Sequence, residues 1–502
     1  MSVKASCWLS GTLKGTALRV ALSSFILFIT LTAMSVEAQA EPYLAPDRQL
    51  RNDVQLLADA GILDRPVTTW PIPAASLASI RGADLRDHPA PVRAAYRRVI
   101  RELECSGGSV RLRTSNDPNP RTHFGDQPDH RYDAAAAWGW NAEHHGGRVQ
   151  GNVVHDADED KTRSHLDGSY GTLRLGNWLL SAGAQDRWWG PGWEGSLILG
   201  DNARPMPMVS FERDDARPTD APVIRWLGAW NLTTFLGQHE SDRNDAPRAK
   251  LFGMRLAFRP LDGLEIGLSR TAQWGGKDRP ETARSFWNMF TGRSNQGDDD
   301  PDLRGGDANQ FGGYDFRWAS PIGNRPYAIY GQLIGIDEAG YLPYQYMGLL
   351  GGEIWWQQGR NQVRVNLEVA DTTPEFHRGD RRRGSSGYVH SFYRDGYRYR
   401  GRVLGHAMDG EGLMVSVGAQ LIRPNGDFWH LLLRHTEQNR DGQDNRAVGV
   451  EERAIITGAE LYHTLHRGQN SITWSAGADY IRPRTGSDTI EPRAWAGYSR
   501  RF

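Results

Sequence analysis

The chain has 502 residues and nearly balanced charge, with 59 Lys and Arg against 60 Asp and Glu, and it contains 57 Gly and 18 Trp. Balanced charge argues against nucleic acid as a partner, because nucleic-acid binding needs a concentrated positive surface. Abundant glycine together with abundant tryptophan is common in exported β-proteins, which have tight turns and interfacial aromatic belts.

The first forty residues predict a signal peptide. Lys4, Lys14 and Arg19 precede the apolar run 20–31, and the small residues 38–40 supply a cleavage site. The apolar run is too short for a comfortable membrane span, and no later segment approaches the roughly 20 apolar residues of a transmembrane helix. The mature chain is therefore expected to be exported without a helical anchor, with 56 basic and 59 acidic residues.

Residues 41–108 have helical patterning. A first helix is predicted to start after Asp47, a residue type that caps helices, and to end at Gly61. A second short helix is expected over 74–81. The third has its apolar residues on one face, at Val92, Tyr96, Val99 and Leu103. Three short helices bury too little apolar surface to fold independently, so we expect them to pack against a larger body.

From about residue 110 the apolar period changes from 3.6 to 2. Apolar and mostly polar residues alternate through 363–370, which indicates a strand with one apolar face. Sixteen such strands are clear, and weaker ones near 110 and 206 raise the number to eighteen. The clear strands are expected near residues 131, 147, 168, 178, 222, 248, 262, 308, 324, 347, 361, 411, 427, 453, 469 and 490. A soluble β-sandwich or propeller is the alternative, but a propeller repeats at a fixed period and no such repeat is present.

The connections between these strands are of two kinds. Short turns are predicted at 260–263, 359–360 and 423–426, and long polar loops at 275–307, 337–346 and 372–410. Transmembrane barrels have short turns on one rim and long loops on the other. We therefore expect residues 109–502 to form an all-β transmembrane barrel of about 16–18 antiparallel strands, with eighteen favoured, preceded by a small N-terminal α-helical bundle over 41–108.

The search for catalytic and metal-binding motifs finds little. The sequence lacks a G-x-S-x-G elbow, an H-E-x-x-H pair and a phosphate-binding G-x-x-x-x-G-K-[ST] loop. His390 and Ser391 are adjacent, and adjacent residues on a strand point to opposite faces, so they do not form a nucleophile and base pair by themselves. The acidic run 156–160 starts like a calcium loop, but Lys161 stands where such a loop needs Gly. That run and the run 298–300 are interpreted as solvated loops. No enzymatic activity, metal or cofactor is predicted.

Two stretches combine aromatic rings with polar side chains. The first surrounds Gly190-Pro191-Gly192 with tryptophans, and this composition makes a rigid turn. The second is the loop 376–410, where tyrosines and arginines interleave. Sugars are held by aromatic platforms and by polar hydrogen-bond partners. Direct polysaccharide contact is therefore predicted for Trp188, Trp189, Trp193, Asn202, Arg204, Tyr397, Tyr399, Arg400 and His406. The alternative is that the aromatic residues pack in a core or an interfacial girdle and the arginines line a wet lumen.

Two stretches resemble the Wzi-type capsule assembly family. They are RWWGPGWEGSLILGDNARPMPMVSFER (187–213) and YRYRGRVLGHAMDGEG (397–412). The resemblance extends over the whole mature chain, from the helical segment to the terminal Phe502. It implies an eighteen-stranded barrel whose helical bundle lies at the periplasmic end. It also implies a non-catalytic, lectin-like protein in the outer membrane of a Gram-negative cell, which attaches capsular or extracellular polysaccharide to the cell surface.

The resemblance also implies a set of partners. These are capsular or extracellular polysaccharide, outer-membrane lipid and, during biogenesis, the outer-membrane insertion machinery, which recognises a terminal Phe on the last strand. Arg500 departs from the apolar residue that is usual two places before that Phe. No nucleic acid is expected, and the sequence is compatible with a monomer. A substrate-specific porin or oligosaccharide channel is the alternative function and requires an open lumen. An outer-membrane hydrolase would need a Ser/His pair brought together by the fold.

Overall fold

The structure is a computed structural model. It describes residues 41–502 apart from residues 105–106, 118, 126, 156–162, 293–307, 324, 337, 340–341, 344, 375, 377–386, 391 and 441–451. The predicted signal peptide, the acidic runs 156–160 and 298–300, and Ser391 lie outside the described residues.

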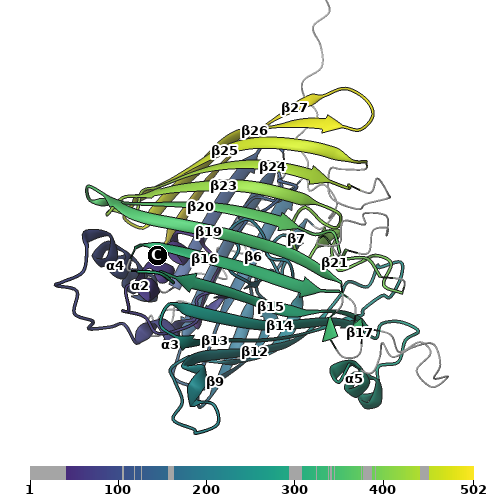
Figure 1. Cartoon of the computed structure of the whole chain (residues 1–502), viewed down its shortest axis with the longest axis horizontal. Coiled ribbons are helices and arrows are strands. Elements are labelled where there is room, and N and C mark those ends of the chain that lie inside the picture. Colours follow the sequence, from purple (N-terminus) through teal and green to yellow (C-terminus); the bar gives the residue numbers. More distant parts are fainter. Residues whose placement is uncertain are drawn as a thin grey trace, which may run out of the picture. The chain divides into compact units, whose positions relative to one another are not determined.

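The described residues form one closed antiparallel barrel of eighteen strands (Figure 1). The strands are β4 (Gly107–Ser115), β5 (Tyr132–Asn141), β6 (His145–His155), β8 (Tyr170–Leu175), β9 (Trp178–Ala184), β11 (Pro207–Arg213), β12 (Ala229–Gln238), β13 (Lys250–Leu261), β14 (Leu264–Trp274), β15 (Asn309–Ala319), β16 (Tyr327–Gly335), β19 (Tyr346–Gln358), β20 (Asn361–Asp371), β23 (Leu413–Ile422), β24 (Phe428–Gln438), β25 (Ala454–Arg467), β26 (Asn470–Pro483) and β27 (Thr489–Arg501). A two-residue strand, β7 (Ser164–His165), is added beside β6. The prediction of eighteen strands, both weaker ones included, is confirmed.

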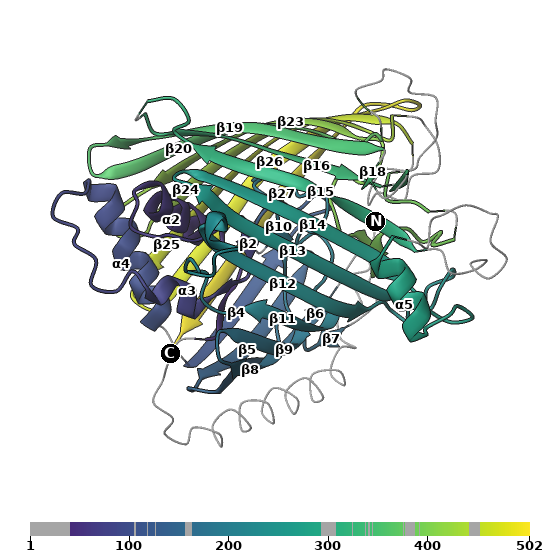
Figure 2. The ribbon, with the colours of Figure 1, turned by 60° about the horizontal axis from the view of Figure 1, so that its bottom comes forward.

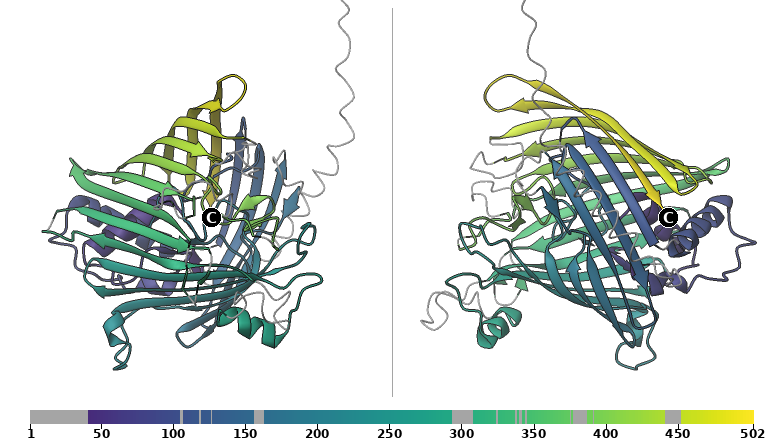
Figure 3. Two further views of the ribbon diagram at one scale, coloured as in Figure 1. Left: turned by 45° about the vertical axis from the view of Figure 1, so that its right-hand side comes forward. Right: turned by 180° about the vertical axis from the view of Figure 1, so that it is seen from behind.

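Each strand pairs with its neighbour along the chain, and the last strand closes the barrel against the first. Trp495 of β27 pairs with Ser115 of β4, and seven consecutive residues of each strand are in register. Figure 3 shows the yellow C-terminal strand beside the blue strand β4. The strand expected near 222 starts later, at Ala229, because residues 225–227 form a 3₁₀ turn, η1 (Arg225–Leu227), which ends at Gly228 with a φ of 64°.

The strands of the barrel wall have their polar side chains on the face that lines the lumen. In β20 the side chains of Arg364, Asn366 and Glu368 are fully buried, whereas Leu367 and Val369, on the opposite face, are 52% and 39% exposed. Successive strand residues point to opposite faces, so the buried polar face lines the lumen and the apolar face points outward. This pattern is that of a transmembrane barrel, in which lipid contacts the apolar face.

Short turns and long loops lie at opposite ends of the barrel, as predicted. The connection between β11 and β12, residues 214–228, departs from this pattern, since it is long and lies at the short-turn end. The turns after β13 and β19 consist of two residues each, and they contain Gly263 and Gly359, which have the positive φ values of 74° and 62° that glycine adopts without strain. The N-terminal helices lie at the short-turn end (Figure 2). The long loops lie at the other end and contain the small strands β17 (Glu338–Ala339), β18 (Leu342–Pro343), β21 (Arg398–Tyr399) and β22 (Arg402–Val403).

The three predicted N-terminal helices are present as α2 (Arg48–Asp59), α3 (Ala74–Ala78) and α4 (Ala90–Glu104). Asp47 caps α2 by accepting a hydrogen bond from the amide of Leu50 at 2.7 Å. The helix expected over 74–81 is shorter and ends at Ala78. The apolar core of these helices includes Trp355 of the barrel strand β19 and Trp188 of the connection between β9 and β11. Whether residues 41–108 form a separate periplasmic domain stays a prediction.

One helix, α5 (Ala283–Phe290), was not predicted. It lies in the long loop between β14 and β15, and Thr282 caps its first turn. None of the helices in the described part of the chain is long and apolar enough to cross a membrane.

Candidate functional site

The connection between β9 and β11, residues 185–206, enters the barrel, and we call it the plug loop. It starts at the long-loop end. Trp188 and Trp189 form the short strand β10 (Trp188–Trp189), which pairs with β2 (Thr69–Trp70) of the N-terminal segment. The amide of Gly190 also donates to the carbonyl of Thr68 at 3.0 Å. The plug loop therefore joins the N-terminal segment to the interior of the barrel.

The three tryptophans of the plug loop are core residues. Trp188, Trp189 and Trp193 are at most 2% exposed. The indole N–H of Trp193 donates to the carboxylate of Glu353 at 2.9 Å, and its amide donates to the carboxylate of Glu368 at 2.8 Å. The alternative interpretation, core packing, therefore describes these rings. Their contact with sugar stays an untested prediction, and the proposed function below does not depend on it.

A buried arginine of helix α2 holds the glycine-proline turn. Arg51 donates to the carbonyls of Pro191 and Gly192, at 2.5 and 2.7 Å. Its guanidinium lies 4.3 Å from the ring centroid of Trp193 and 4.4 Å from that of Phe124. Burial lowers the pKa of Arg51 to about 9, so the side chain stays charged at neutral pH. The charge is compensated by two carbonyl dipoles and two aromatic faces, and a cation over an aromatic face is a favourable contact.

The second predicted stretch packs directly on the plug loop. We call residues 387–412 the outer loop. Its Tyr388 and Tyr397 hydroxyls donate to the carbonyls of Leu197 and Ile198, at 2.7 and 2.9 Å. In the other direction, the side-chain amide of Asn202 donates to the carbonyl of Val403 at 3.1 Å. Tertiary structure thus brings together two stretches that lie about 200 residues apart in the sequence.

Most of the predicted site residues lie inside this assembly. Tyr397 and His406 are almost fully buried, and burial raises the pKa of Tyr397 and lowers that of His406 to about 3. Asn202 is buried as well and contacts Thr122. These three residues join the plug loop to its neighbours, as the three tryptophans do. Arg204, Tyr399 and Arg400 are the predicted residues that lie at the long-loop end.

These three residues belong to a cluster of aromatic and charged side chains, which we call the rim cluster (Asp167, Arg204, Glu240, Asp242, Tyr399 and Arg400). The Nε of Arg204 lies 2.7 Å from a carboxylate oxygen of Asp167. Arg400 lies 3.7 Å from Asp242, and its guanidinium is 6.0 Å from the ring centroid of Tyr399. The backbone amide of Arg400 donates to Glu240. Arg204 and Arg400 are partly exposed, and the carboxylate of Asp242 is mostly exposed.

The electrostatics of the rim cluster favour the ionised form of Asp167. Burial opposes the ionisation of Asp167, but hydrogen bonds from His165 and Arg204 outweigh it and hold its pKa below the usual value. Burial raises the pKa of Tyr399, so its hydroxyl stays protonated. The cluster therefore presents charged groups of both signs at neutral pH, beside a tyrosine that is only 7% exposed. Such charged groups can hold the hydroxyl groups of a sugar.

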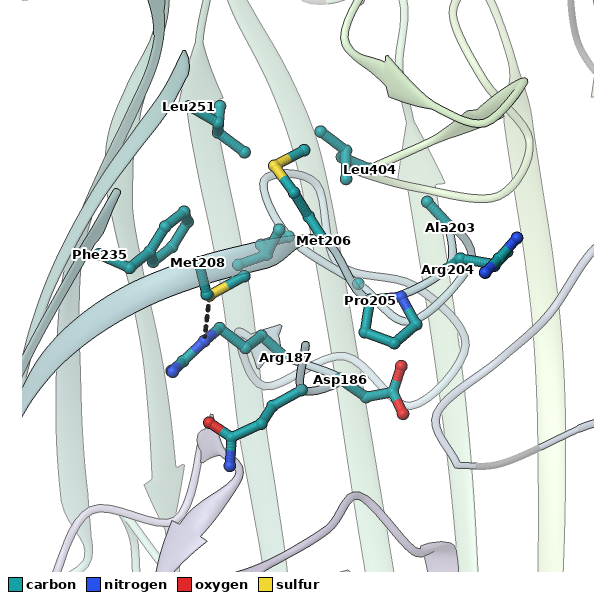
Figure 4. A pocket seen from close by; sticks show the side chains of 13 residues that line it. Asp186, Arg187, Ala203, Arg204, Pro205, Met206, Met208, Phe235, Leu251 and Leu404 are labelled. Atoms are coloured by element: carbon teal, nitrogen blue, oxygen red, sulfur yellow. Dashed lines mark hydrogen bonds between the residues drawn. The ribbon is translucent and has the colours of Figure 1, made fainter. Parts of the chain in front are cut away.

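A pocket adjoins the rim cluster where the plug loop leaves β9 and enters β11 (Figure 4). Arg204 lies on one side, and Asp186 and Arg187 lie below, with the Nε of Arg187 3.1 Å from the sulfur of Met208. The remaining wall is mostly apolar and comes from distant elements; it includes Met206, Phe235, Leu251 and Leu404. Phe235 and Leu251 were not predicted from the sequence, because the lumen face of β12 and β13 has no motif that links it to residue 204.

In the part of the chain that the structure describes, no group of three or more His, Cys, Asp or Glu residues could hold a metal ion. His390 is described, but its neighbour Ser391 is not, so the geometry of that pair is outside the described residues.

The fold and the site together define a class: a transmembrane β-barrel that holds its own plug loop, with an aromatic and charged cluster at one end. The family model described as "Capsule assembly protein Wzi" matches residues 104–485. A Klebsiella pneumoniae protein, described as an uncharacterized 55.8 kDa protein in the cps region, is 32% identical over 425 residues, which cover 83% of this chain and 82% of the relative. The chain belongs to the capsule assembly protein Wzi family.

A solved structure agrees with this assignment. It is that of Wzi from Escherichia coli, described as an outer membrane protein involved in group 1 capsule assembly and as a carbohydrate-binding β-barrel. It matches with a TM-score of 0.81 at 29% identity, over 92% of this chain and 99% of that chain. The resemblance stated from the sequence is confirmed.

Proposed function

We propose that the protein assists the assembly of capsular or extracellular polysaccharide by attaching the polymer to the cell surface, without catalysis. The observation that carries this proposal is the rim cluster, which lies beside a lumen that packed segments of the same chain occupy. The description of the Escherichia coli relative as a carbohydrate-binding barrel involved in capsule assembly supports the same role.

The barrel is placed in the outer membrane with its long loops outside the cell. This orientation follows the general rule that outer-membrane barrels have short periplasmic turns and longer extracellular loops. It places α2, α3 and α4 on the periplasmic side and the rim cluster on the extracellular side, where exported polymer is found. A signal peptide over residues 1–40, contact with outer-membrane lipid, help from the insertion machinery and a monomeric state belong to the same proposal.

The packing of the lumen favours attachment over transport. Arg51 and the carboxylates of Glu353 and Glu368 bind the plug loop from one side, and Tyr388 and Tyr397 bind it from the other. A channel would need these buried contacts to break for each passage. Planar-bilayer conductance tests the porin alternative.

Direct binding is assigned to the exposed part of the rim cluster. Arg204 and Arg400 provide fixed donors for hydroxyl or carboxylate oxygens, since the planar guanidinium carries several donors in a rigid arrangement. Tyr399 is only 7% exposed and packs beside Arg400, and Asp167 accepts from sugar hydroxyls. The polymer is expected to lie over the end of the barrel and to leave the lumen closed.

The test is the division of high-molecular-mass polysaccharide between cells and medium. A deletion strain should release polymer without changing its total amount, and re-expression should return the polymer to the cells. The double variant Arg204→Ala, Arg400→Ala should fail to restore attachment, although it is present in the membrane. Arg360→Ala, an exposed arginine in the turn between β19 and β20, is the matched control and should restore attachment fully. An unchanged division in the deletion strain would refute the proposed function.

A further inference from the structure

Helix α5 packs on the outside of the barrel wall. The cross-strand pairs Phe252–Ala272 and Lys250–Trp274 of β13 and β14 lie on the outward face, because the intervening Gln273 contacts His239 and Gly396 inside. Outward residues of the wall are expected to be exposed, yet Phe252, Ala272 and Trp274 are at most 9% exposed. They are covered by three residues of α5 at helical spacing, Phe286, Met289 and Phe290. Figures 1 and 2 show α5 outside the strands, at the end with the long loops.

The wall fixes both ends of this helix. Arg270, an outward-facing residue of β14, donates to the carbonyls of Phe290 and Met289 at 2.7 and 2.8 Å. A cation at the C-terminal carbonyls of a helix is stabilising. At the other end Thr282 and Ser285 form a capping box, and the indole N–H of Trp274 on the wall donates to the hydroxyl of Ser285 at 3.3 Å. The helix is therefore a built part of the wall.

The side of α5 that points away from the wall is aromatic and basic. Trp287 is 58% exposed, and Arg284, three residues earlier, lies on the same side of the helix. Lys277, in the loop before α5, is also exposed. Within the described residues neither Arg284 nor Lys277 has an ion-pair partner. In the described part of the chain, this surface offers an amphipathic ring and Arg284 on one side of the helix, and Lys277 in the loop before it.

The position of α5 along the wall corresponds to a membrane interface. At the other end of β13, Trp226 of η1 is 61% exposed and packs against the outward-facing Phe258, with ring centroids 5.6 Å apart. Phe252 and Phe258 are six residues apart, which corresponds to about 20 Å along a strand. The outward residues between them, Met254 and Leu256, are apolar. A strand tilted by about 40° rises only about 15 Å along the membrane normal over this length. α5 and η1 lie at the two ends of this apolar segment, where a barrel of this type has its aromatic girdles.

We propose that α5 is an interfacial anchor. Trp287 lies among the headgroups of the outer leaflet, and Arg284 and Lys277 bind the phosphates of anionic lipid there. The proposal rests on the proposed placement of the barrel in the outer membrane. Tryptophan is enriched at this depth because its ring is apolar and its N–H is polar, and basic side chains near an anionic leaflet are attracted to it.

A nitroxide label at position 287 tests the depth. Trp287→Cys is made in a Cys105→Ser background, which removes the one other cysteine of residues 41–502. The full barrel is placed in phosphatidylcholine vesicles that contain phosphatidylglycerol, and the collision of the label with oxygen and with a water-soluble nickel complex is measured. Leu268→Cys, on the outward face of β14, reports the bilayer interior. Ser241→Cys, in the exposed loop after β12, reports water.

The label at 287 is expected to show a depth between those of the two references. A label at 287 that behaves like position 241 would place α5 in water, and one shielded from both collision partners would place it against protein. Either result overturns the proposal. If the label at position 268 is not in lipid, the proposed placement of the barrel in the membrane is wrong. The proposal that α5 is an interfacial anchor is then wrong as well.

The charge is tested by comparing neutral phosphatidylcholine vesicles with vesicles that also contain phosphatidylglycerol. Anionic lipid should raise the melting temperature of the parent protein. The double variant Lys277→Gln, Arg284→Gln should lose at least half of that rise. Arg325→Gln changes an exposed arginine in the turn between β15 and β16, at the opposite rim, and should keep the full rise. An unchanged rise in the double variant would show that these cations do not bind lipid phosphate.

Discussion

Arg51 and His406 are two buried ionisable side chains that the fold accommodates in different ways. Arg51 stays charged because the carbonyls of Pro191 and Gly192 accept its hydrogen bonds. His406 is the opposite case, since burial alone lowers its pKa to about 3. At neutral pH it is therefore an uncharged ring packed between the outer loop and the plug loop.

The burial of His406 predicts a dependence of stability on pH. An unfolded histidine has a pKa of about 6.5, whereas His406 in the folded protein has a pKa of about 3. Between these values the unfolded chain binds a proton that the folded protein does not bind, so the free energy of unfolding falls as the pH falls. His406→Gln should reduce this fall by up to a few kcal/mol over that range, measured by denaturant unfolding at several pH values.

The matched control is His144→Gln, in the exposed turn between β5 and β6, where the imidazole is 79% exposed. It should leave the pH profile of the parent unchanged. If the profiles of His406→Gln and the parent coincide from pH 3 to pH 7, the buried neutral state of His406 is wrong.

The plug loop and the outer loop act as one structural element. Their backbones are joined at Gly200 and Leu404, where an amide donates to a carbonyl at 2.7 Å. The side chain of His406 lies close to Gly195, where an added Cβ would lie 2.0 Å from the Cδ2 atom of His406. Only a hydrogen atom fits there, so this glycine is needed for the close contact of the two loops.

Gly195→Ala should therefore destabilise the assembly of the two loops. Overpacking a buried contact costs about 1–3 kcal/mol, and the His406 ring cannot move away without losing its own packing. The expected result is a lower melting temperature and faster hydrogen exchange in residues 195–200 and 404–408. Gly171→Ala is the control, because its Cβ would meet nothing within 4 Å, and it should be nearly neutral. Equal effects of the two substitutions would contradict the tight contact.

The helices and strands with a regular apolar period could be predicted from the sequence. The strands were predicted because each alternates between two faces, and α2 and α4 because their apolar residues recur at helical spacing. Helix α5 was missed, although Phe286, Met289 and Phe290 have that spacing, because a segment of eight residues within a long polar loop gives a weak signal. The rim cluster was predicted in part, through Arg204, Tyr399 and Arg400. Asp167 and Asp242 were not predicted, since loop carboxylates have no pattern of their own.

For the whole molecule, the occupied lumen predicts low conductance. Ala184 and Pro207 pair directly across β9 and β11, so the plug loop can be replaced without interrupting the wall. A variant in which a short Gly-Ser linker replaces residues 188–204 should conduct more ions in planar bilayers than the parent, because the segment between α2 and the outer loop is gone. The parent protein should show a much smaller conductance under the same conditions. Parent currents as large as those of the variant would favour the channel alternative.

The sequence by itself determined the barrel, the number of its strands and the family, because period-two alternation and the two family-like stretches are local properties of the chain. Only the tertiary structure decided the roles of the aromatic residues. Trp188, Trp193 and Tyr397 have the composition of a sugar platform, but whether a ring is open or covered depends on segments hundreds of residues away. Arg51 and Glu353 cover Trp193, whereas Arg204 and Arg400 remain at the rim. Burial is a property of the folded chain, and local patterns do not contain it.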